Sequence, residues 1–417
     1  MTETLDFAAL LRPSDRLAWP GVAMEPIELL AQLEAQLENI PSDTSCLLNI
    51  SLTDAIDAER LAKHMRITAL GGSVTNRRFG AIDGLDVLPI NYGAIPDLIS
   101  TGALQIDCVL HHMAPDGDDY NLSLMADYLP EAIAKARTVI AEINDQLPVT
   151  YGDTTIDRAD VDHILHVSRP PVEVASRPAR ALEKEISGHV ARLISDGDTL
   201  EVGLGSLPDA VLEGLADKRD LGVHSGTIGD RVAELVDAGV ITNARKPIDT
   251  DKCVTATLLG TSRLYRWAHK NEGLEVRSPR YTHDNAVHAR IPRFMAINSA
   301  LEIDLTGQVN SETIGHAHVG VIGGQSDFMR GGIRSPGGRN IIVLEATARK
   351  GTVSRIVPRF KAGIVTAARS EADVVVTEYG IAELHGRTVH ERADALIAIA
   401  HPNFRSRLRA VASEGLI

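Results

Sequence analysis

The sequence predicts an α/β protein built from two domain-sized units. Three observations lead to this prediction: the chain has 417 residues, short aliphatic runs alternate with segments of helical periodicity, and a proline-rich stretch divides the chain. A chain of this length is expected to form two or three domains with ample core. Strands that alternate with helices are typical of α/β architecture.

The predicted strands are short, rich in Val, Ile and Leu, and bounded by Gly, Asp or Pro, as buried parallel strands are. They are Ser45–Ile50, Val87–Ile90, Cys108–Leu110, Thr199–Val202, Ile341–Leu344 and Val374–Thr377. Segments with helical spacing of apolar residues lie between the strands. These are Pro26–Leu37, Glu131–Asn144, Ala181–Ile194, Asp209–Leu215 and Arg231–Ala238.

A domain boundary is predicted in the segment Ser168–Pro178, which contains three prolines. Proline removes a backbone donor and fixes φ, so this segment is poorly suited to a helix or a central strand. We therefore expect an N-terminal α/β domain over residues 1–175 and a C-terminal α/β domain over residues 176–417.

The composition excludes several classes of protein. Hydrophobic residues make up 44% and charged residues 24%, which excludes a mainly disordered chain. The 42 basic and 56 acidic residues give a net charge of −14, which disfavours nucleic acid or an anionic membrane as a partner. Aromatic residues are only 4%, too few for a base-stacking platform, and no apolar run approaches the ~20 residues of a membrane span.

The three cysteines Cys46, Cys108 and Cys253 lie far apart, so neither a zinc site nor a dithiol redox centre is expected. They are interpreted as reduced structural residues, and no metal site is predicted. The N-terminal sequence does not have the basic, apolar and small-residue order of a secretory signal. A cytoplasmic location is therefore expected.

A glycine turn between a strand and a helix is the first candidate site. It contains Gly203 and Gly205, and Ser206 is expected to cap the helix that follows. The free amides at a helix N-terminus favour an anion. Pro208 occupies the sixth position, so the segment is not a dinucleotide-binding fingerprint. An ordinary strand-to-helix turn is the alternative interpretation.

A double glycine is the second candidate, in the segment from Gly320 through Gly323, Gly324 and Gln325. Paired glycines after an apolar stretch can present backbone N–H groups to a developing oxyanion, because no Cβ obstructs a substrate there. The alternative is a surface loop that requires positive φ.

A basic segment follows the double glycine. Between Arg330 and Lys361 the chain has eight basic residues and one acid, Glu345, a local balance of +7 in a chain of −14. Such a segment suits a phosphate-bearing ligand, with Lys350 and Arg355 as candidate contacts. A solvated face or a subunit contact is the alternative interpretation.

Seven blocks in the C-terminal half follow one another in order: 203–215, 221–230, 296–312, 320–328, 354–358, 374–387 and 400–404. With the N-terminal segments Gly21–Pro26 and 76–98, they resemble the acetyl-CoA hydrolase/transferase family, including 4-hydroxybutyrate CoA-transferases, within the family I CoA transferases. The resemblance covers most of the chain.

The resemblance implies two similar open α/β domains with mainly parallel sheets and an acyl-CoA held between them. It implies CoA transfer from a short acyl-CoA to a small carboxylate, or hydrolysis of the acyl-CoA, with no permanently bound cofactor. In the family a glutamate attacks the thioester and the double glycine stabilises the oxyanion. The residues implied to contact substrate or CoA are Gly203, Gly205, Ser225, Gly226, Asn285, Gly320, Gln325, Lys350 and Arg355, with Gly323 and Gly324 at the oxyanion. A homodimer is the default assembly.

The chain departs from this family pattern at Gly226. The family block reads His-Ser/Thr-Glu, with the glutamate as nucleophile, whereas this chain reads His224-Ser225-Gly226. Four explanations remain open. The sequence is compatible with a relocated carboxylate, with a water activated by His224, and with direct transfer in a ternary complex. It is also compatible with loss of catalysis, which would leave an acyl-CoA-binding protein.

Three acids are candidates for a relocated carboxylate: Glu25, Asp54 and Glu201. Each also has a structural interpretation, since Glu25 and Asp54 can cap helices and Glu201 can be paired inside the protein. Asn285 and Asn298 lie in segments that border the substrate in the family, and Asn298 can instead brace the loop beneath the site.

Overall fold

The computed structural model describes residues 4–72, 79 and 85–415. Part of the N-terminal family segment, residues 76–78 and 80–84, lies outside these described residues. Contacts divide the chain into two compact units. The first unit comprises Met1–Ala175, Val254–Thr282 and His318–Gly323, and the second comprises Ser176–Cys253, His283–Ala317 and Gly324–Ile417.

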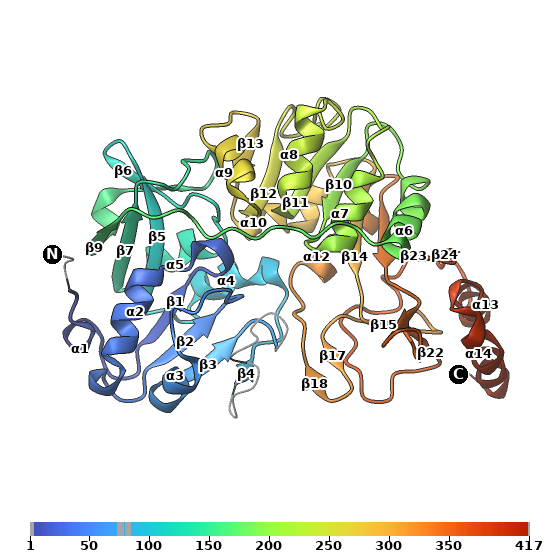
Figure 1. Cartoon of the computed structure of the whole chain (residues 1–417), viewed down its shortest axis with the longest axis horizontal. Helices are drawn as coiled ribbons and strands as arrows, with labels where there is room; N and C mark the ends of the chain where they lie inside the picture. The colour runs from blue at the N-terminus through green and yellow to red at the C-terminus, as the bar shows by residue number, and fades with distance from the viewer. Residues whose placement is uncertain (1–3, 73–78, 80–84, 416–417) are drawn as a thin grey trace. The chain divides into compact units, whose positions relative to one another are not determined.

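The first unit is built on a parallel sheet in the strand order β4-β3-β2-β1-β5-β7-β9 (Figure 1). The antiparallel strands β6 and β8 extend from β5. The bounds are β1 (Arg16–Trp19), β2 (Ser45–Leu48), β3 (Arg66–Ala69), β4 (Asp86–Val87), β5 (Cys108–Asp116), β6 (Asp119–Asn121), β7 (Thr138–Asn144), β8 (Thr155–Ile156) and β9 (His163–Val167).

Phe7, Leu30 and Leu61, from the first three helices in the chain, pack in one core with strand residues of the first unit. This unit has seven helices within the described residues. They are α1 (Phe7–Leu10), α2 (Ile27–Ala35), α3 (Ala58–His64), α4 (Ile95–Thr101), α5 (Leu129–Lys135), α9 (Ser262–Ala268) and α10 (Pro279–Thr282), with short turns η1 (Val22–Met24), η2 (Leu37–Asn39), η4 (Tyr92–Ala94) and η5 (Arg158–Asp160). Strands β12 (Cys253–Leu258) and β13 (Leu274–Val276) precede and follow α9 in the chain.

One predicted helix in this unit is wrong in its second half. The sequence suggested a helix over Glu131–Asn144, but α5 ends at Lys135 and Thr138–Asn144 forms strand β7. Every residue of β7 is buried, and Val139, Ile140 and Ile143 favour a strand that is covered on both faces. Their spacing imitates a helical stripe, and the burial of both faces could not be read from the sequence.

The second unit has strands in the order β11-β10-β14-β19-β23-β24, parallel except for the β23–β24 pair. Their bounds are β10 (Thr199–Val202), β11 (Gly222–Ile228), β14 (Phe294–Ser299), β19 (Arg339–Val343), β23 (Val374–Thr377) and β24 (Gly380–Glu383). The described residues also contain the short strands β15 (Glu302–Asp304), β16 (Val309–Asn310), β17 (Thr313–Ile314), β18 (Ala317–His318), β20 (Thr347–Ala348), β21 (Val353–Ser354) and β22 (Ile356–Val357). The prediction of mainly parallel α/β sheets is confirmed.

The helices of the second unit are α6 (Ala181–Ala191), α7 (Ser206–Glu213), α8 (Asp230–Asp237), α11 (Asn285–His288), α12 (Gln325–Arg334), α13 (Val389–Ile399) and α14 (Pro402–Glu414). Thr388 and Glu391 form a capping box that fixes the start of α13. Its leucine and isoleucine side chains join β19 and β23 in one core. Because β10, β11 and β14 are parallel, their carboxyl ends lie at one edge of the sheet, where ligands bind in open α/β folds.

Within the described part of the chain, no helix is long and apolar enough to cross a membrane. The same residues contain no group of three or more His, Cys, Asp or Glu side chains arranged to hold a metal ion. The three cysteines are buried thiols that form no disulfide.

Candidate active site at the carboxyl ends of β10, β11 and β14

Glu201, His224 and Gly226 lie on one face of the second unit's sheet. The parallel register pairs Thr199 with Gly222 and Leu200 with Val223. Continuing this register places Glu201 opposite His224, and the next residue of the same face on β11 is Gly226. Because side chains alternate along a strand, a side chain at position 226 would point to the same face as Glu201.

Glu201 is a buried carboxyl group with one side-chain partner. Its side chain is only 3% exposed, and Asn298 Nδ2 on β14 donates a hydrogen bond of 2.6 Å to its Oε2 atom. Burial raises the pKa of Glu201 to about 8, and the hydrogen bond from Asn298 opposes that rise. Glu201 is therefore mostly protonated at neutral pH and can exchange a proton close to it. Of the three candidate acids, it is the one that shares a unit with Gly226.

Gly226 and Gly324 both face the imidazole of His283. A Cβ atom added at Gly226 would lie 3.1 Å from His283 Nε2 and 3.1 Å from Phe328 Cε2. A Cβ atom added at Gly324 would lie 2.5 Å from the same nitrogen, closer than real side chains approach. Both glycines are half-buried and His283 is 5% exposed. His283 thus fills the space that a side chain at either position would enter.

The His283 ring belongs to a cluster of packed aromatic side chains. Its ring lies 4.5 Å from that of Phe328, while His288 stacks on Phe294 with 4.8 Å between ring centroids. His224 contacts His288 edge to face and is fully buried. Burial lowers the pKa of His283 to about 3, and the neighbouring His288 adds to this effect. His283 is therefore neutral at physiological pH, and His224 is placed as a core residue instead of a solvent-facing base.

Ser225 ties β10 to β11. Its buried hydroxyl lies 3.1 Å from the Val202 carbonyl oxygen and 3.0 Å from that of Thr227, and it accepts a hydrogen bond from the Val202 amide. These contacts hold the end of β10 beside position 226. Ser225 is therefore a brace for the site.

The glycine turn after β10 begins α7 without a side-chain cap. Gly205 has φ of 119° and is the N-cap residue, a conformation that favours glycine. The prediction that Ser206 caps this helix is wrong, because Ser206 is its first residue and donates to Glu183 Oε1 at 2.9 Å. Gly203 has open space where a Cβ would lie. The backbone at Gly203 and Gly205 is therefore accessible to a ligand.

The double glycine leads into α12. Gly323 has φ of 56°, which favours glycine, and Gly324 is the N-cap of α12. Gln325 is buried and donates from Nε2 to the Ser299 carbonyl oxygen at 3.3 Å, which links α12 to the end of β14. In the first unit, the carbonyl of Gly320 accepts a hydrogen bond from Gly72 at 2.8 Å. The amides that begin α12 are positioned to stabilise negative charge.

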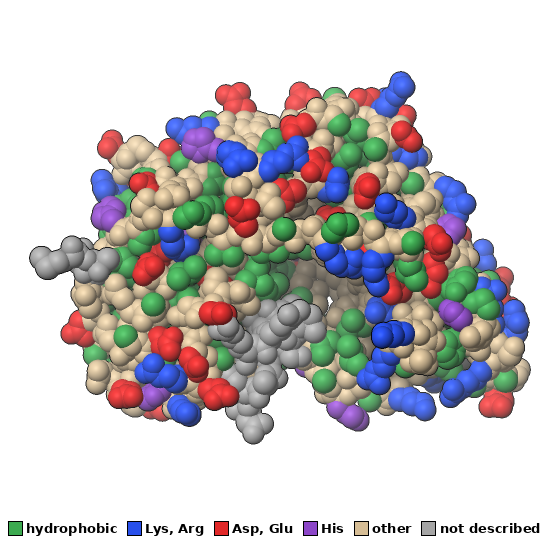
Figure 2. All heavy atoms as spheres, viewed as in Figure 1, with side chains coloured by type: hydrophobic (Ala, Val, Ile, Leu, Met, Phe, Trp, Pro, Cys, Tyr) green, Lys and Arg blue, Asp and Glu red, His purple; other side chains and the backbone are tan. Residues whose placement is uncertain are grey.

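The basic segment divides into two parts. Arg330 pairs with Glu371 at 2.7 Å and Arg339 pairs with Asp373 at 2.7 Å, so these two residues stabilise the fold. Lys350 is exposed and Arg355 is half-buried. Lys and Arg side chains gather on the face of Figure 2 over the part of the second unit that carries β15, β22 and the C-terminal helices.

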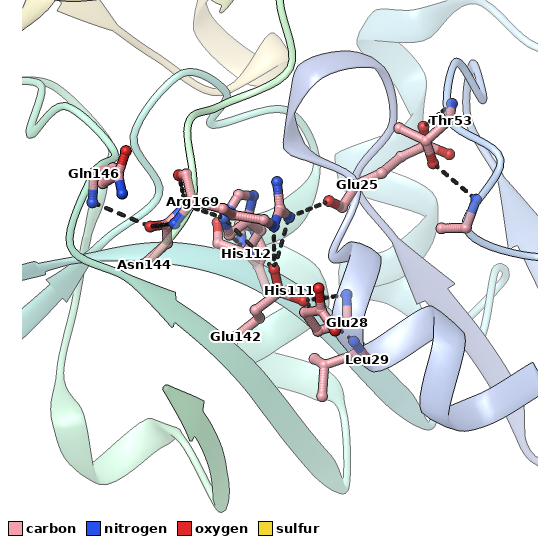
Figure 3. A network of polar contacts seen from close by, with 11 residues as sticks. Glu25, Glu28, Leu29, Thr53, His111, His112, Glu142, Asn144, Gln146 and Arg169 are labelled. Atoms are coloured by element: carbon pink, nitrogen blue, oxygen red, sulfur yellow. Dashed lines mark hydrogen bonds and ion pairs between the residues drawn. The ribbon is translucent and has the colours of Figure 1, made fainter. Parts of the chain in front are cut away.

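Glu25 holds a turn of the first unit. Its carboxylate accepts hydrogen bonds from the Ser51 hydroxyl at 2.6 Å and from the amides of Leu52 and Thr53 at 2.9 and 2.8 Å. Figure 3 shows Glu25 directed toward Thr53, while Arg169 donates to the Glu25 backbone carbonyl. Burial raises the pKa of Glu25. The oxygens of this carboxylate are engaged in a structural role.

The remaining candidates are Asp54 and Asn285. Asp54 is exposed in the first unit. Asn285 is the first residue of α11, and its buried Oδ1 atom accepts no hydrogen bond from any described residue. Sequence reasoning missed His283, two residues before Asn285, because no motif spacing links it to Gly226 or Gly324.

Comparisons with known proteins show the family of the chain. Residues 260–412 match the model of the acetyl-CoA hydrolase/transferase C-terminal domain. A 4-hydroxybutyrate coenzyme A transferase from Clostridium kluyveri is 41% identical over 353 residues, which cover 84% of this chain and 82% of the relative.

Two solved structures resemble the whole chain. RipA from Yersinia pestis has a TM-score of 0.92 at 31% identity, covering 98% of this chain and 96% of that one. A 4-hydroxybutyrate CoA-transferase from Porphyromonas gingivalis has a TM-score of 0.83 at 32% identity, covering 97% and 94%. Similarity of this extent spans both units.

Proposed function

Because this chain belongs to the acetyl-CoA hydrolase/transferase family, we propose that it transfers CoA from a short acyl-CoA to a small carboxylate such as 4-hydroxybutyrate. Its family makes it an enzyme that acts on a CoA thioester, by CoA transfer or by hydrolysis. The name of the Clostridium kluyveri relative supports transfer, and it supports a small hydroxy acid as the acceptor.

The buried Glu201–Asn298 pair beside Gly226 is the observation that carries the proposal. A carboxyl group stands on the strand next to position 226 and on the same face. Its pKa is raised to about 8 because burial disfavours the charged carboxylate, and no cation of the described residues is among the causes that lower this pKa. A desolvated carboxylate is a stronger nucleophile than a solvated one, so Glu201 can supply the carboxylate that position 226 lacks.

The proposed reaction proceeds through two covalent intermediates on Glu201, an anhydride and a CoA thioester. The Glu201 carboxylate attacks the thioester carbonyl carbon, and CoA leaves as a thiolate, which gives an acyl-glutamyl anhydride. The thiolate attacks the glutamyl carbonyl carbon, and the acyl group leaves as a free carboxylate. An incoming carboxylate attacks the resulting glutamyl-CoA thioester by the reverse sequence, forms the new acyl-CoA and restores Glu201.

The other predicted residues have roles in binding. The amides at Gly323, Gly324 and Gln325 are proposed to stabilise the oxyanion. The turn at Gly203 and Gly205 is proposed to lie along the pantetheine, and Gly320 and Asn285 to border the acyl group. We propose Lys350 and Arg355 as contacts of the CoA phosphates, with Ser225 as the brace of β10 and β11.

Hydrolysis is the second candidate, and Gly226 is the observation that favours it. A glycine leaves position 226 without a carboxylate, so water rather than a second substrate could accept the acyl group. The third alternative is that the protein binds acyl-CoA without any reaction. The experiment must distinguish this alternative from transfer and from hydrolysis.

A panel of short acyl-CoAs, with and without small carboxylates, tests the proposal. We expect the wild-type protein to form a new acyl-CoA only when the acceptor carboxylate is present, and Glu201→Gln to lose this transfer. Thiol release that needs no acceptor would establish hydrolysis instead. Tight CoA binding without product across the whole panel would contradict both enzymatic alternatives.

Assembly, location and domain division complete the proposal. We propose a homodimer in the cytoplasm, with domains divided near residue 175 and no resident cofactor. Light scattering measures the assembly, cell fractionation measures the location, and the absorbance spectrum and metal content of the purified protein measure any bound cofactor.

A further inference from the structure

The side chain of His283 is the polar group nearest to both glycines of the site. Its Nε2 atom is the nearest atom to a Cβ at Gly226, at 3.1 Å, and to a Cβ at Gly324, at 2.5 Å. Both glycines are half-buried, so a substrate that lies against them meets the same imidazole nitrogen. The His283 side chain, on the loop before α11, therefore lies beside both β11 at Gly226 and the start of α12 at Gly324.

The ring of His283 is held in place by its surroundings. It packs on Phe328 of α12 with 4.5 Å between ring centroids. The next residue, Asp284, caps α11 through a hydrogen bond of 2.7 Å to the Ala286 amide, which fixes the backbone on which His283 is carried. A side chain positioned in this way loses little further entropy when it contacts a ligand.

We propose that His283 is a catalytic residue that takes the place of a side chain at position 226 and donates an Nε2–H hydrogen bond to the thioester carbonyl oxygen beside Gly324. This inference rests on the proposed function, because it assigns a further group to the same thioester. It also gives a reason for Gly226, since any larger residue would displace the imidazole.

A neutral imidazole is suited to this role. His283 carries no charge above a pH of about 3, because burial disfavours the imidazolium form. Neutral imidazole donates a hydrogen bond to a developing oxyanion without delivering a proton, as in enzymes that polarise a carbonyl group with a neutral histidine. The amide donors at the start of α12 and the His283 N–H would then converge on one oxygen.

Substitution of His283 tests the hydrogen bond directly. We expect His283→Ala to lower kcat by roughly 10²–10³-fold with KM for acyl-CoA nearly unchanged, which is the usual effect of losing one oxyanion donor. His283→Gln retains an N–H donor and is expected to recover part of the loss. The activity of the wild type is expected to show no inflection near pH 6.5, since His283 does not titrate there.

His288→Gln is the matched control. His288 belongs to the same aromatic cluster but faces Gly331, whose added Cβ would lie 2.2 Å from His288 Nδ1, instead of Gly226 and Gly324. A fully retained kcat in His283→Ala, or an equal kcat loss in His283→Ala, His283→Gln and His288→Gln, would overturn the proposal. The second result would mean that the cluster is needed only for packing.

A paired substitution tests the space that His283 fills. We expect Gly226→Glu to inactivate the wild-type background, because its Cβ meets the imidazole, and to be less harmful when combined with His283→Ala. Equal effects of Gly226→Glu in both backgrounds would contradict the shared space. Inactivity of the wild type itself against every acyl-CoA would instead contradict the proposed function, so the two failures are distinguishable.

Discussion

Glu201 links the ionisation of one buried carboxyl group to both stability and activity. It is almost fully buried, its hydrogen-bond partners are the neutral side chain of Asn298 and the backbone of Ile297, and its pKa is about 8. A carboxyl group in such surroundings costs free energy whenever it is ionised, because water no longer solvates it. Enzymes tolerate that cost where the group reacts, and a strongly shifted pKa in a site is a sign of function.

Stability is expected to fall as pH rises through the window between the two pKa values of Glu201. In the folded protein Glu201 keeps its proton up to about pH 8, whereas in the unfolded chain it releases the proton near the ordinary glutamate pKa of 4.5. The native state therefore binds more protons in that window, and unfolding becomes easier by up to about 1.4 kcal/mol per pH unit from this group alone.

Denaturant unfolding of the wild type and Glu201→Gln between pH 5 and pH 8 measures this linkage. The glutamine variant cannot ionise and should show a weaker pH dependence, so its stability relative to the wild type should increase with pH. Identical slopes for the two proteins would show that Glu201 is not a carboxyl group with a raised pKa.

Catalytic activity is expected to increase as Glu201 ionises, whereas stability decreases. The carboxylate form attacks the thioester, so kcat should rise with pH, reach half of its maximum near pH 8 and level off above it. Single-turnover rates at saturating acyl-CoA measure this, because they exclude product release. A rate that is constant from pH 6 to pH 9 would argue against Glu201 as the nucleophile.

The start of α12 and the ends of β10, β11 and β14 form the site together. Gln325 links α12 to β14, and Ser225 links β11 to β10. Gly324, the residue before α12, lies so close to the His283 ring that an added Cβ would be only 2.5 Å from Nε2. Small displacements of any of these ends are therefore expected to reduce catalysis before they unfold the protein.

Gly324→Ala is expected to abolish detectable catalysis and to lower stability by roughly 1–3 kcal/mol, because its Cβ would overlap His283 and Phe328. Gly188→Ala in α6 is a suitable control, since nothing lies within 4 Å of its Cβ. That change should leave activity intact and stabilise the helix by about 0.5–1 kcal/mol. Thermal unfolding and kcat of both variants give the comparison, and an active Gly324→Ala would contradict the close packing.

The sequence predicts local features of this site better than long-range ones. The parallel α/β architecture and the glycine turns follow from the composition and order of short segments, and both are present. The strand β7 was missed because its burial on both faces depends on β5 and β9. The predicted Ser206 cap is wrong because the Ser206 hydroxyl donates instead to Glu183, 23 residues earlier. The Glu201–Asn298 hydrogen bond and the approach of His283 to Gly226 and Gly324 join residues that no local pattern connects.

The charge distribution of the whole chain defines where a polyanion can bind. The net charge of −14 repels anions from most of the surface, whereas the segment from Arg330 to Lys361 is basic. Arg330 and Arg339 form ion pairs with Glu371 and Asp373. Of the six other basic residues of this segment, we propose Lys350 and Arg355 as contacts of the CoA phosphates.

Replacement of Lys350 or Arg355 by alanine should weaken CoA binding by about 1–3 kcal/mol through loss of a charge-assisted contact. The difference from the wild type should shrink as salt increases, because mobile ions screen exposed charges. Lys63→Ala in α3 is a control for net charge, since Lys63 is exposed on the first unit. Calorimetry at two salt concentrations measures these effects, and unchanged affinity in both variants at low salt would assign the segment to a structural role.

The site of covalent attachment during turnover tests the central claim most directly. The protein is incubated with an acyl-CoA, treated with borohydride to reduce any glutamyl-CoA thioester to an alcohol, digested and analysed by peptide mass spectrometry. The account predicts a modified peptide at Glu201 in the wild type and none in Glu201→Gln. Modification of Glu25 or Asp54 instead, or transfer that proceeds with no modified carboxylate, would contradict it.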